Sequence, residues 1–304
     1  MKLSRQKIIH SLQFVICCTT LVVFLPACSS DDDSPLPGIE EDSNGRALRQ
    51  LTINDASLTR ATIDAATLAA SWTTGDVATY VNLSLLPGQM DYGDLTAASS
   101  AQTTLLEGNV YCREADHLAV IYPSVTPAND GSLIVDLRGQ KGTLADVGQR
   151  FHYVFGVAEV TKVENKTATA TVSPMKSLLA LCKFTFSDGT NPIAVKELKI
   201  SYGSSGTRGY PKTGTVTLDA NSSADNVTVK ATNPTTSEDK VPLTIKLDDA
   251  TTEGVHVALF PMDQSSDFHF TVIDGSNNTY TGTAKAKLRA GKYYDSTLKL
   301  TKNN

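Results

Sequence analysis

The sequence predicts an all-β protein built as two tandem β-sandwiches, and three observations predict it. Short segments in which apolar and polar residues alternate recur along the chain, with turn residues between them. Long helical periodicity is missing. The chain has 304 residues, of which 40% are hydrophobic and 19% charged. Such a composition is typical of a folded protein, and the length suits two domains of common size.

The predicted strands follow from period-two patterns. Val77–Leu83 places alternate residues on one apolar face after the turn signal Gly75-Asp76, and Leu118–Tyr122 is a continuous apolar run that Pro123 ends. Such a run is typical of a strand buried on both faces. Ser57–Ala70 and Leu95–Leu106 are too rich in Thr and Ser to predict helices. Further strands are expected at Tyr153–Val160, Val195–Tyr202, Gly214–Leu218, Val227–Lys230, Val241–Leu247, Val255–Phe260, Phe268–Ile273 and Tyr294–Leu300.

The N-terminus carries a predicted export signal. Basic residues precede an apolar run from about Phe14 to Leu25, which is too short for a convincing membrane-spanning helix, and Leu25-Pro26-Ala27-Cys28 follows. This arrangement resembles a bacterial lipoprotein signal, in which the peptide is cut before Cys28 and the cysteine receives lipid. Pro26 departs from that pattern, and the alternative is an ordinary secretory signal cut nearby.

An acidic cluster, Ser29-Ser30-Asp31-Asp32-Asp33, stands beside the proposed lipidation site. It resembles the export tag of surface-exposed lipoproteins in the Bacteroidetes, and it is also compatible with a solvated charge run in a tether. Ser29–Gly45 has few apolar residues, so we expect a flexible tether that reaches roughly 20–25 Å. The expected location is the outer membrane at the cell surface, through a lipid anchor on Cys28.

The expected organisation therefore has four parts. These are a signal peptide (1–27), a lipidated tether (28–45), an N-terminal β-sandwich (46–170) and a C-terminal β-sandwich (171–304). The boundary between the sandwiches follows a polar stretch, Lys162–Thr167, and precedes a new apolar unit that starts at Met175.

The sequence offers no catalytic or cofactor-binding motif, so we expect neither an enzyme nor a cofactor. His117, His152, His256 and His269 have no spacing for a triad or a metal site, although His256 and His269 would meet across a hairpin if their strands were paired. No metal is expected. The formal net charge of −5 argues against nucleic acid as a partner.

Two cysteines and one tryptophan of the mature chain have competing interpretations. Cys17 and Cys18 lie in the signal, which leaves Cys112 and Cys182. These two could form a disulfide, but buried unpaired thiols are the favoured interpretation. Trp72, the only tryptophan, is interpreted as a core anchor in preference to a platform that stacks on sugars.

Several motifs, taken in order, resemble a known family. They are the lipoprotein signal with its acidic cluster, Leu58-Thr59-Arg60-Ala61 upstream of Trp72-Thr73-Thr74-Gly75-Asp76, Ala119–Ser124, Met175–Phe186, and Ala290–Tyr294 before the last strand. Over nearly the whole mature chain this order resembles the fimbrillin-like lipoproteins of Bacteroidetes, the subunits of type V pili. The resemblance implies transthyretin-like sandwiches and a role as a structural or adhesive pilus subunit.

The resemblance also implies how such a subunit assembles. A protease cuts after an arginine in the N-terminal region, for which Arg46, Arg49 and Arg60 are the candidates, and other pilus subunits then add a strand by donor-strand exchange. Only Thr301–Asn304 follows the last apolar strand residue, so we expect an acceptor of strands, as a tip or accessory subunit would be. A host or bacterial surface ligand is a further expected partner. The alternative is a stand-alone glycan-binding surface lipoprotein.

Overall fold

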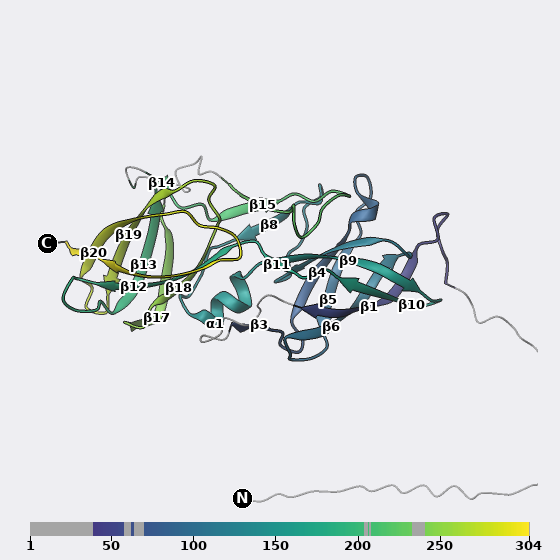
Figure 1. Ribbon diagram of the computed structural model, residues 1–304, viewed down its shortest axis with the longest axis horizontal. Coiled ribbons are helices and arrows are strands. Elements are labelled where there is room, and N and C mark those ends of the chain that lie inside the picture. The colour runs from purple at the N-terminus through teal and green to yellow at the C-terminus, as the bar shows by residue number, and fades with distance from the viewer. Residues whose placement is uncertain are drawn as a thin grey trace, which may run out of the picture. The chain divides into compact units, whose positions relative to one another are not determined.

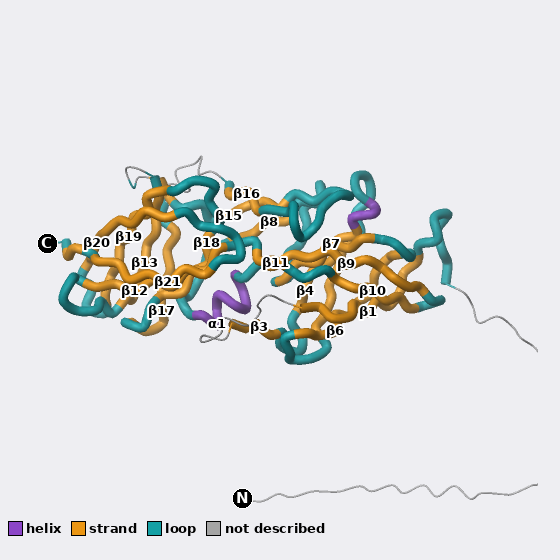
Figure 2. The backbone as a smooth tube through the Cα atoms, in the orientation of Figure 1, coloured by secondary structure: helices purple, strands orange, loops and turns teal. Residues whose placement is uncertain are grey.

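The structure is a computed structural model that describes residues 39–57, 62–63, 70–203, 206, 208–232 and 241–303 (Figure 1). Strands dominate the described residues, and the helical elements are short: η1 (Leu83–Leu85), α1 (Leu144–Asp146) and η2 (Val147–Phe151). Figure 2 shows the same predominance of strands. None of the helices in the described ranges is long and apolar enough to cross a membrane. The all-β prediction is confirmed.

An eight-stranded sheet forms the first half of the body. Its order is β10-β1-β6-β5-β4-β7-β9-β11, and β10 also pairs with β9, so the sheet closes on itself. We call it the closed sheet. Neighbouring strands are antiparallel except β1 and β10, which are parallel. Its strands are β1 (Ala47–Ser57), β4 (Val77–Asn82), β5 (Tyr92–Ala97), β6 (Thr103–Cys112), β7 (His117–Tyr122), β9 (Val154–Val163), β10 (Thr167–Val172) and β11 (Lys176–Ser177).

Two sheets make up a sandwich in the second half. One has the order β18-β12-β21, and the other has the order β14-β13-β19-β20-β22, with β17 also paired to β13. The strands are β12 (Ala180–Ser187), β13 (Val195–Tyr202), β14 (Arg208–Gly209), β17 (Leu243–Thr251), β18 (Val255–Leu259), β19 (Ser266–Asp274), β20 (Thr279–Ala286), β21 (Tyr293–Lys299) and β22 (Thr301–Lys302).

Two small sheets complete the described strands. A three-stranded sheet joins residues of the two predicted sandwiches, because β8 (Leu133–Asp136) pairs with β15 (Thr213–Val216), which also pairs with β16 (Val229–Ala231). A two-stranded sheet consists of β2 (Thr62–Ile63) and β3 (Ala70–Ser71). The domain boundaries from the sequence remain predictions.

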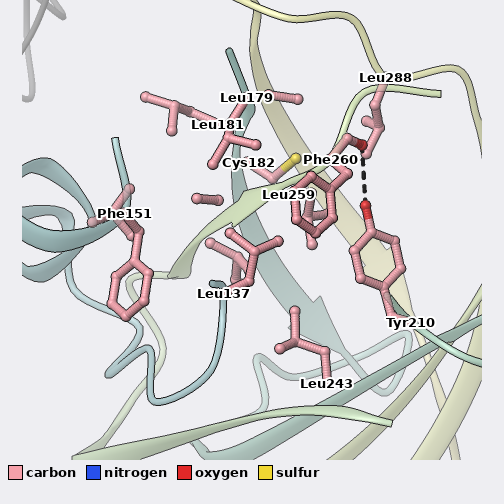
Figure 3. Packing of buried hydrophobic residues seen from close by; sticks show 14 of the residues in the cluster. Leu137, Phe151, Leu179, Leu181, Cys182, Tyr210, Leu243, Leu259, Phe260 and Leu288 are labelled. Carbon is pink, nitrogen blue, oxygen red and sulfur yellow. Dashed lines mark hydrogen bonds between the residues drawn. The ribbon is translucent and has the colours of Figure 1, made fainter. Parts of the chain in front are cut away.

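Two hydrophobic cores hold these sheets together. The first lies inside the closed sheet, and the second fills the sandwich and reaches the outer face of the closed sheet. In the second core Tyr210 is fully surrounded, and its hydroxyl donates to the carbonyl oxygen of Phe260 at 3.1 Å (Figure 3). β7 serves both cores, since Leu118 and Val120 face the first while Ala119 and Ile121 face the second. This confirms that the apolar run is buried on both faces.

One sequence prediction about the sandwich is wrong. His256 lies on β18 and His269 on β19, and these consecutive strands belong to different sheets. The chain crosses from one sheet to the other between them, so the two imidazoles do not face each other across a hairpin. His269 is instead hydrogen-bonded through Nε2 to the carbonyl oxygen of Gly203 at 2.7 Å.

Candidate functional site

β1 is the strand that completes the closed sheet. Ala47–Ile53 pairs antiparallel with Leu106–Cys112 of β6, and Gln50–Asn54 pairs in parallel with Thr167–Thr171 of β10. β1 therefore fills the position between β6 and β10, which we call the β1 slot (Figure 1). Removing β1 would leave two rows of unpaired backbone groups, an arrangement that favours pairing with another strand.

Apart from the buried Arg49, the inner face of β1 is apolar. Leu51 and Ile53 are fully buried in the core of the closed sheet, as is Ala56. The register shifts between Ile53 and Ala56, and this irregularity brings Ala56 inward although it lies three positions after Ile53. Burial of one large aliphatic side chain contributes about 1.5–3 kcal/mol, so Leu51 and Ile53 supply much of the attraction that holds β1.

A buried ion pair holds the start of β1. Arg46 donates from Nε to Oδ2 of Asp116 at 2.8 Å and from Nη2 to Oδ1 at 2.7 Å, and both side chains are buried. Asn82, at the end of β4, donates from Nδ2 to Oδ2 of the same carboxylate at 3.1 Å. The backbone N–H of Arg113 adds a bond of 3.2 Å. We call Arg46, Asn82 and Asp116 the Arg46 clamp.

The clamp sets the charge state of Asp116. Burial raises the pKa of the carboxyl, but the hydrogen bonds from Arg46 and Asn82 outweigh this effect, and the resulting pKa lies below the ordinary 3.8. Asp116 is therefore a carboxylate at neutral pH. An isolated carboxylate at such a buried position would be costly, so the clamp depends on the guanidinium that β1 supplies.

A second arginine anchors the same end of β1. Arg49 is buried, donates from Nη1 to the carbonyl oxygen of Cys112, and forms an ion pair with Glu41. The turn before β1 is fixed by Asp42, whose carboxylate accepts from the backbone N–H of Arg46 at 2.9 Å. Gly45 adopts a φ of 76° in this turn, a conformation that favours glycine.

Trp72 contacts the other end of β1. Its Nε1 donates to the carbonyl oxygen of Ala56 at 2.9 Å, and its ring packs edge-on against Tyr122 with centroids 5.2 Å apart. Only 1% of Trp72 is exposed. The interpretation as a core anchor is confirmed, and the ring is not available as a surface platform for sugars.

The predicted site residues have different outcomes. Arg46 and Arg49 are buried and serve as anchors of β1 in the intact fold, so a protease reaches the bonds after them only when β1 leaves its sheet. Their cleavage remains a prediction. Cys28, Ser29, Ser30, Asp31, Asp32, Asp33 and Arg60 lie outside the described residues. Asp116 and Asn82 were not among the predicted site residues.

Metal ligands and buried thiols are the other polar groups that a site in the described ranges could use. No three His, Cys, Asp or Glu side chains there gather closely enough to hold a metal ion. Cys112 and Cys182 are both buried and unpaired, and they belong to different cores.

A cleft of about 930 Å³ lies beside β16, and its lining includes His152 but no Phe, Tyr or Trp. That cleft therefore offers no aromatic platform of the kind that stacks on sugars.

Comparison with known proteins gives distant likenesses only. No family model matches the chain, and no curated protein matches it. Among solved structures, it is similar to a Bacteroides eggerthii protein described as a cell adhesion candidate, with 12% identity and a TM-score of 0.42 over 84% of this chain and 86% of that one. It is also similar to a fimbrial protein of Bacteroides vulgatus, with 12% identity and a TM-score of 0.39 over 85% and 98%.

A third solved structure is the tip fimbrial protein Mfa3 of Porphyromonas gingivalis with a C-terminal truncation. Its identity is 8% and its TM-score 0.37, over 78% of this chain and 81% of that one. These neighbours are proteins of the fimbrial and adhesin class that the sequence motifs resemble. The low scores carry no argument about function, which rests on the geometry of the chain itself.

Proposed function

We propose that the protein is a subunit of a surface fibre of the type V pilus class, and that it accepts a strand from a neighbouring subunit at the β1 slot. The observation that carries this proposal is the position of β1. It is the first strand of the described body, it pairs on both edges, and it fills an apolar core position that another strand could take. Strand addition between two open edges gives a very stable assembly.

The candidate cleavage sites differ in what a cut would release. A cut after Arg46 or Arg49 would leave Leu51, Ile53 and Ala56 attached to the rest of the body. A cut after Arg60 would separate the whole of β1 from β4 and the strands that follow, because Arg60 comes three positions after Ser57, where β1 ends. Arg60 is therefore the proposed cleavage site, and β1 is the strand that is exchanged.

The proposal includes delivery and position. The chain reaches the outer membrane as a lipoprotein anchored at Cys28, is displayed at the cell surface, and occupies a tip or accessory place in the fibre. Its role is structural or adhesive, with no catalysis. In support of an acceptor role, β21 pairs with β12 along its length and Leu300 is buried, so the C-terminal strands are integral to their own sandwich.

The test uses a labelled synthetic peptide with the sequence of residues 46–57. The purified chain is treated with an arginine-specific protease, the cut is located by mass spectrometry, and peptide uptake is measured by fluorescence anisotropy. Intact protein should exclude the peptide, because its slot is covalently filled, and protein cut after Arg60 should take it up.

A matched pair of variants makes this test specific. Arg60→Gln should resist the cut and then exclude the peptide, whereas Arg138→Gln, which changes an arginine with an exposed side chain elsewhere, should behave like the parent. Equal uptake by treated Arg60→Gln and by treated parent protein would contradict the proposal, as would a cut protein that never takes up the peptide.

A further inference from the structure

The β1 slot imposes a chemical requirement on any strand that replaces β1. Asp116 is only 1% exposed, and two of its hydrogen bonds come from the guanidinium of Arg46. When β1 leaves, Asn82 and the backbone N–H of Arg113 remain as donors to this carboxylate. The side chain of Arg113 approaches only to 3.6 Å and is half exposed, so it is a weak substitute.

The geometry favours arginine over lysine at this position. The two bonds from Arg46 to Asp116 run in parallel from Nε and Nη2 to separate carboxylate oxygens, at 2.8 and 2.7 Å. A planar guanidinium matches both oxygens at once, whereas an ammonium group acts as a single point charge. A strand with an apolar residue here would bury the carboxylate beside hydrocarbon and leave its charge uncompensated.

Beyond Arg46 and the buried Arg49, the slot sets a pattern of apolar positions. Leu51 and Ile53 lie on one face of β1 with the alternation of a regular strand, and Ala56 joins them after the register shift. Leu48 points outward with 63% of its surface exposed. The slot therefore discriminates among side chains on one face only, and the outer face tolerates change.

We infer, on the basis of the strand exchange proposed above, that the partner of this protein is an extended segment with an arginine at the position of Arg46 and large aliphatic residues at those of Leu51 and Ile53. The arginine pairs with Asp116 and completes the Arg46 clamp in the assembled fibre. Asp116 thus selects the donor strand: a segment with the right apolar pattern but no guanidinium enters poorly.

The test compares peptides that differ at one position. Protein cut after Arg60 is titrated with the peptide of residues 46–57 and with its Arg46→Lys, Arg46→Leu and Leu48→Ala forms. The Arg46→Leu form should bind at least about tenfold more weakly than the parent peptide, and the Arg46→Lys form should fall between them. Leu48→Ala is the matched control and should bind like the parent.

Variants that remove the charge of Asp116 complete the test from the protein side. Cut Asp116→Leu protein should no longer prefer the arginine peptide over its Arg46→Leu form. Cut Asp116→Asn protein, a smaller change that keeps the shape of the site, should show a reduced preference. Loss of preference in either variant supports selection by Asp116, and an unchanged preference in both overturns it.

Failure of the inference is distinguishable from failure of strand exchange. If all four peptides enter the parent protein with equal affinity, strand exchange stands and selection by Asp116 is wrong. If no peptide enters, strand exchange at this slot is wrong and the inference falls with it.

Discussion

Replacing Asp116 with Asn should weaken the closed sheet by a large and measurable amount. The substitution keeps the shape of the side chain but removes the charge that compensates Arg46, whose guanidinium remains buried. Breaking a buried ion pair by removing one partner costs about 3–5 kcal/mol. Since small proteins are stabilised by about 5–15 kcal/mol in total, this loss is a substantial part of the free energy of unfolding.

Urea denaturation followed by tryptophan fluorescence measures this effect. Trp72 is the only tryptophan and hydrogen-bonds to Ala56 of β1, so its emission reports directly on whether β1 is in place. Glu164→Gln is a suitable control, because Glu164 pairs with Lys162 at an exposed position where a pair contributes about 0–1 kcal/mol. A loss for Asp116→Asn no larger than that of the control would refute the reasoning.

The difference in stability between the parent and Asp116→Asn should also depend on pH. Burial raises the pKa of Asp116 in the folded protein, but the hydrogen bonds from Arg46 and Asn82, with the nearby charge of Arg46, together outweigh it, so the pKa lies below the ordinary 3.8. A carboxyl whose pKa is lowered by folding stabilises the fold above its ordinary pKa, and this contribution is lost as the pH falls through the folded value. The difference between the parent and Asp116→Asn should thus be complete at pH 7 and shrink below pH 3.8.

Three further predictions concern β1 and the N-terminal region. Ile53→Ala should lower the free energy of unfolding by about 2–5 kcal/mol in the same urea assay, because it opens a cavity in the core, and an effect below that of Glu164→Gln would contradict the packing of β1. Cys28→Ala should abolish metabolic labelling with a fatty acid, and equal labelling of both forms would exclude lipidation there. Replacing Asp31–Asp33 with Ala should protect the protein from protease added to intact cells, whereas continued digestion would show that this cluster is not needed for display.

Much of the strand pattern could be predicted from the sequence because period-two alternation is a local property. Val195–Tyr202 matches β13 at both ends. In β21, Tyr294, Ser296 and Leu298 are less exposed than the residues between them, as the alternation of a strand requires. β1 escaped prediction because its inner face includes Arg49, and because the register shift after Ile53 breaks the alternation. A charged residue on the core face removes the signal on which the prediction depends.

The candidate site was less predictable because its decisive contact is distant in sequence. Asp116 stands in a polar turn, Arg113-Glu114-Ala115-Asp116, that looks like any solvated loop, and only the fold brings it to Arg46, which lies 70 positions earlier. For the same reason Arg46 and Arg49 look like exposed residues in the sequence, yet both are buried. Pairing of this kind is determined by topology, which a single sequence does not reveal.

The three candidate arginines divide into two roles: Arg46 and Arg49 anchor β1, and Arg60 is the proposed cleavage site. Arg46 and Arg49 fix the start of the strand through Asp116 and the carbonyl oxygen of Cys112, while Trp72 fixes its end at Ala56. A cut after Arg60 would break the covalent link but none of these contacts, so cleavage alone would leave β1 seated. Displacement then requires a strand that replaces the clamp and the apolar face together, which would couple assembly of the fibre to the identity of the incoming strand.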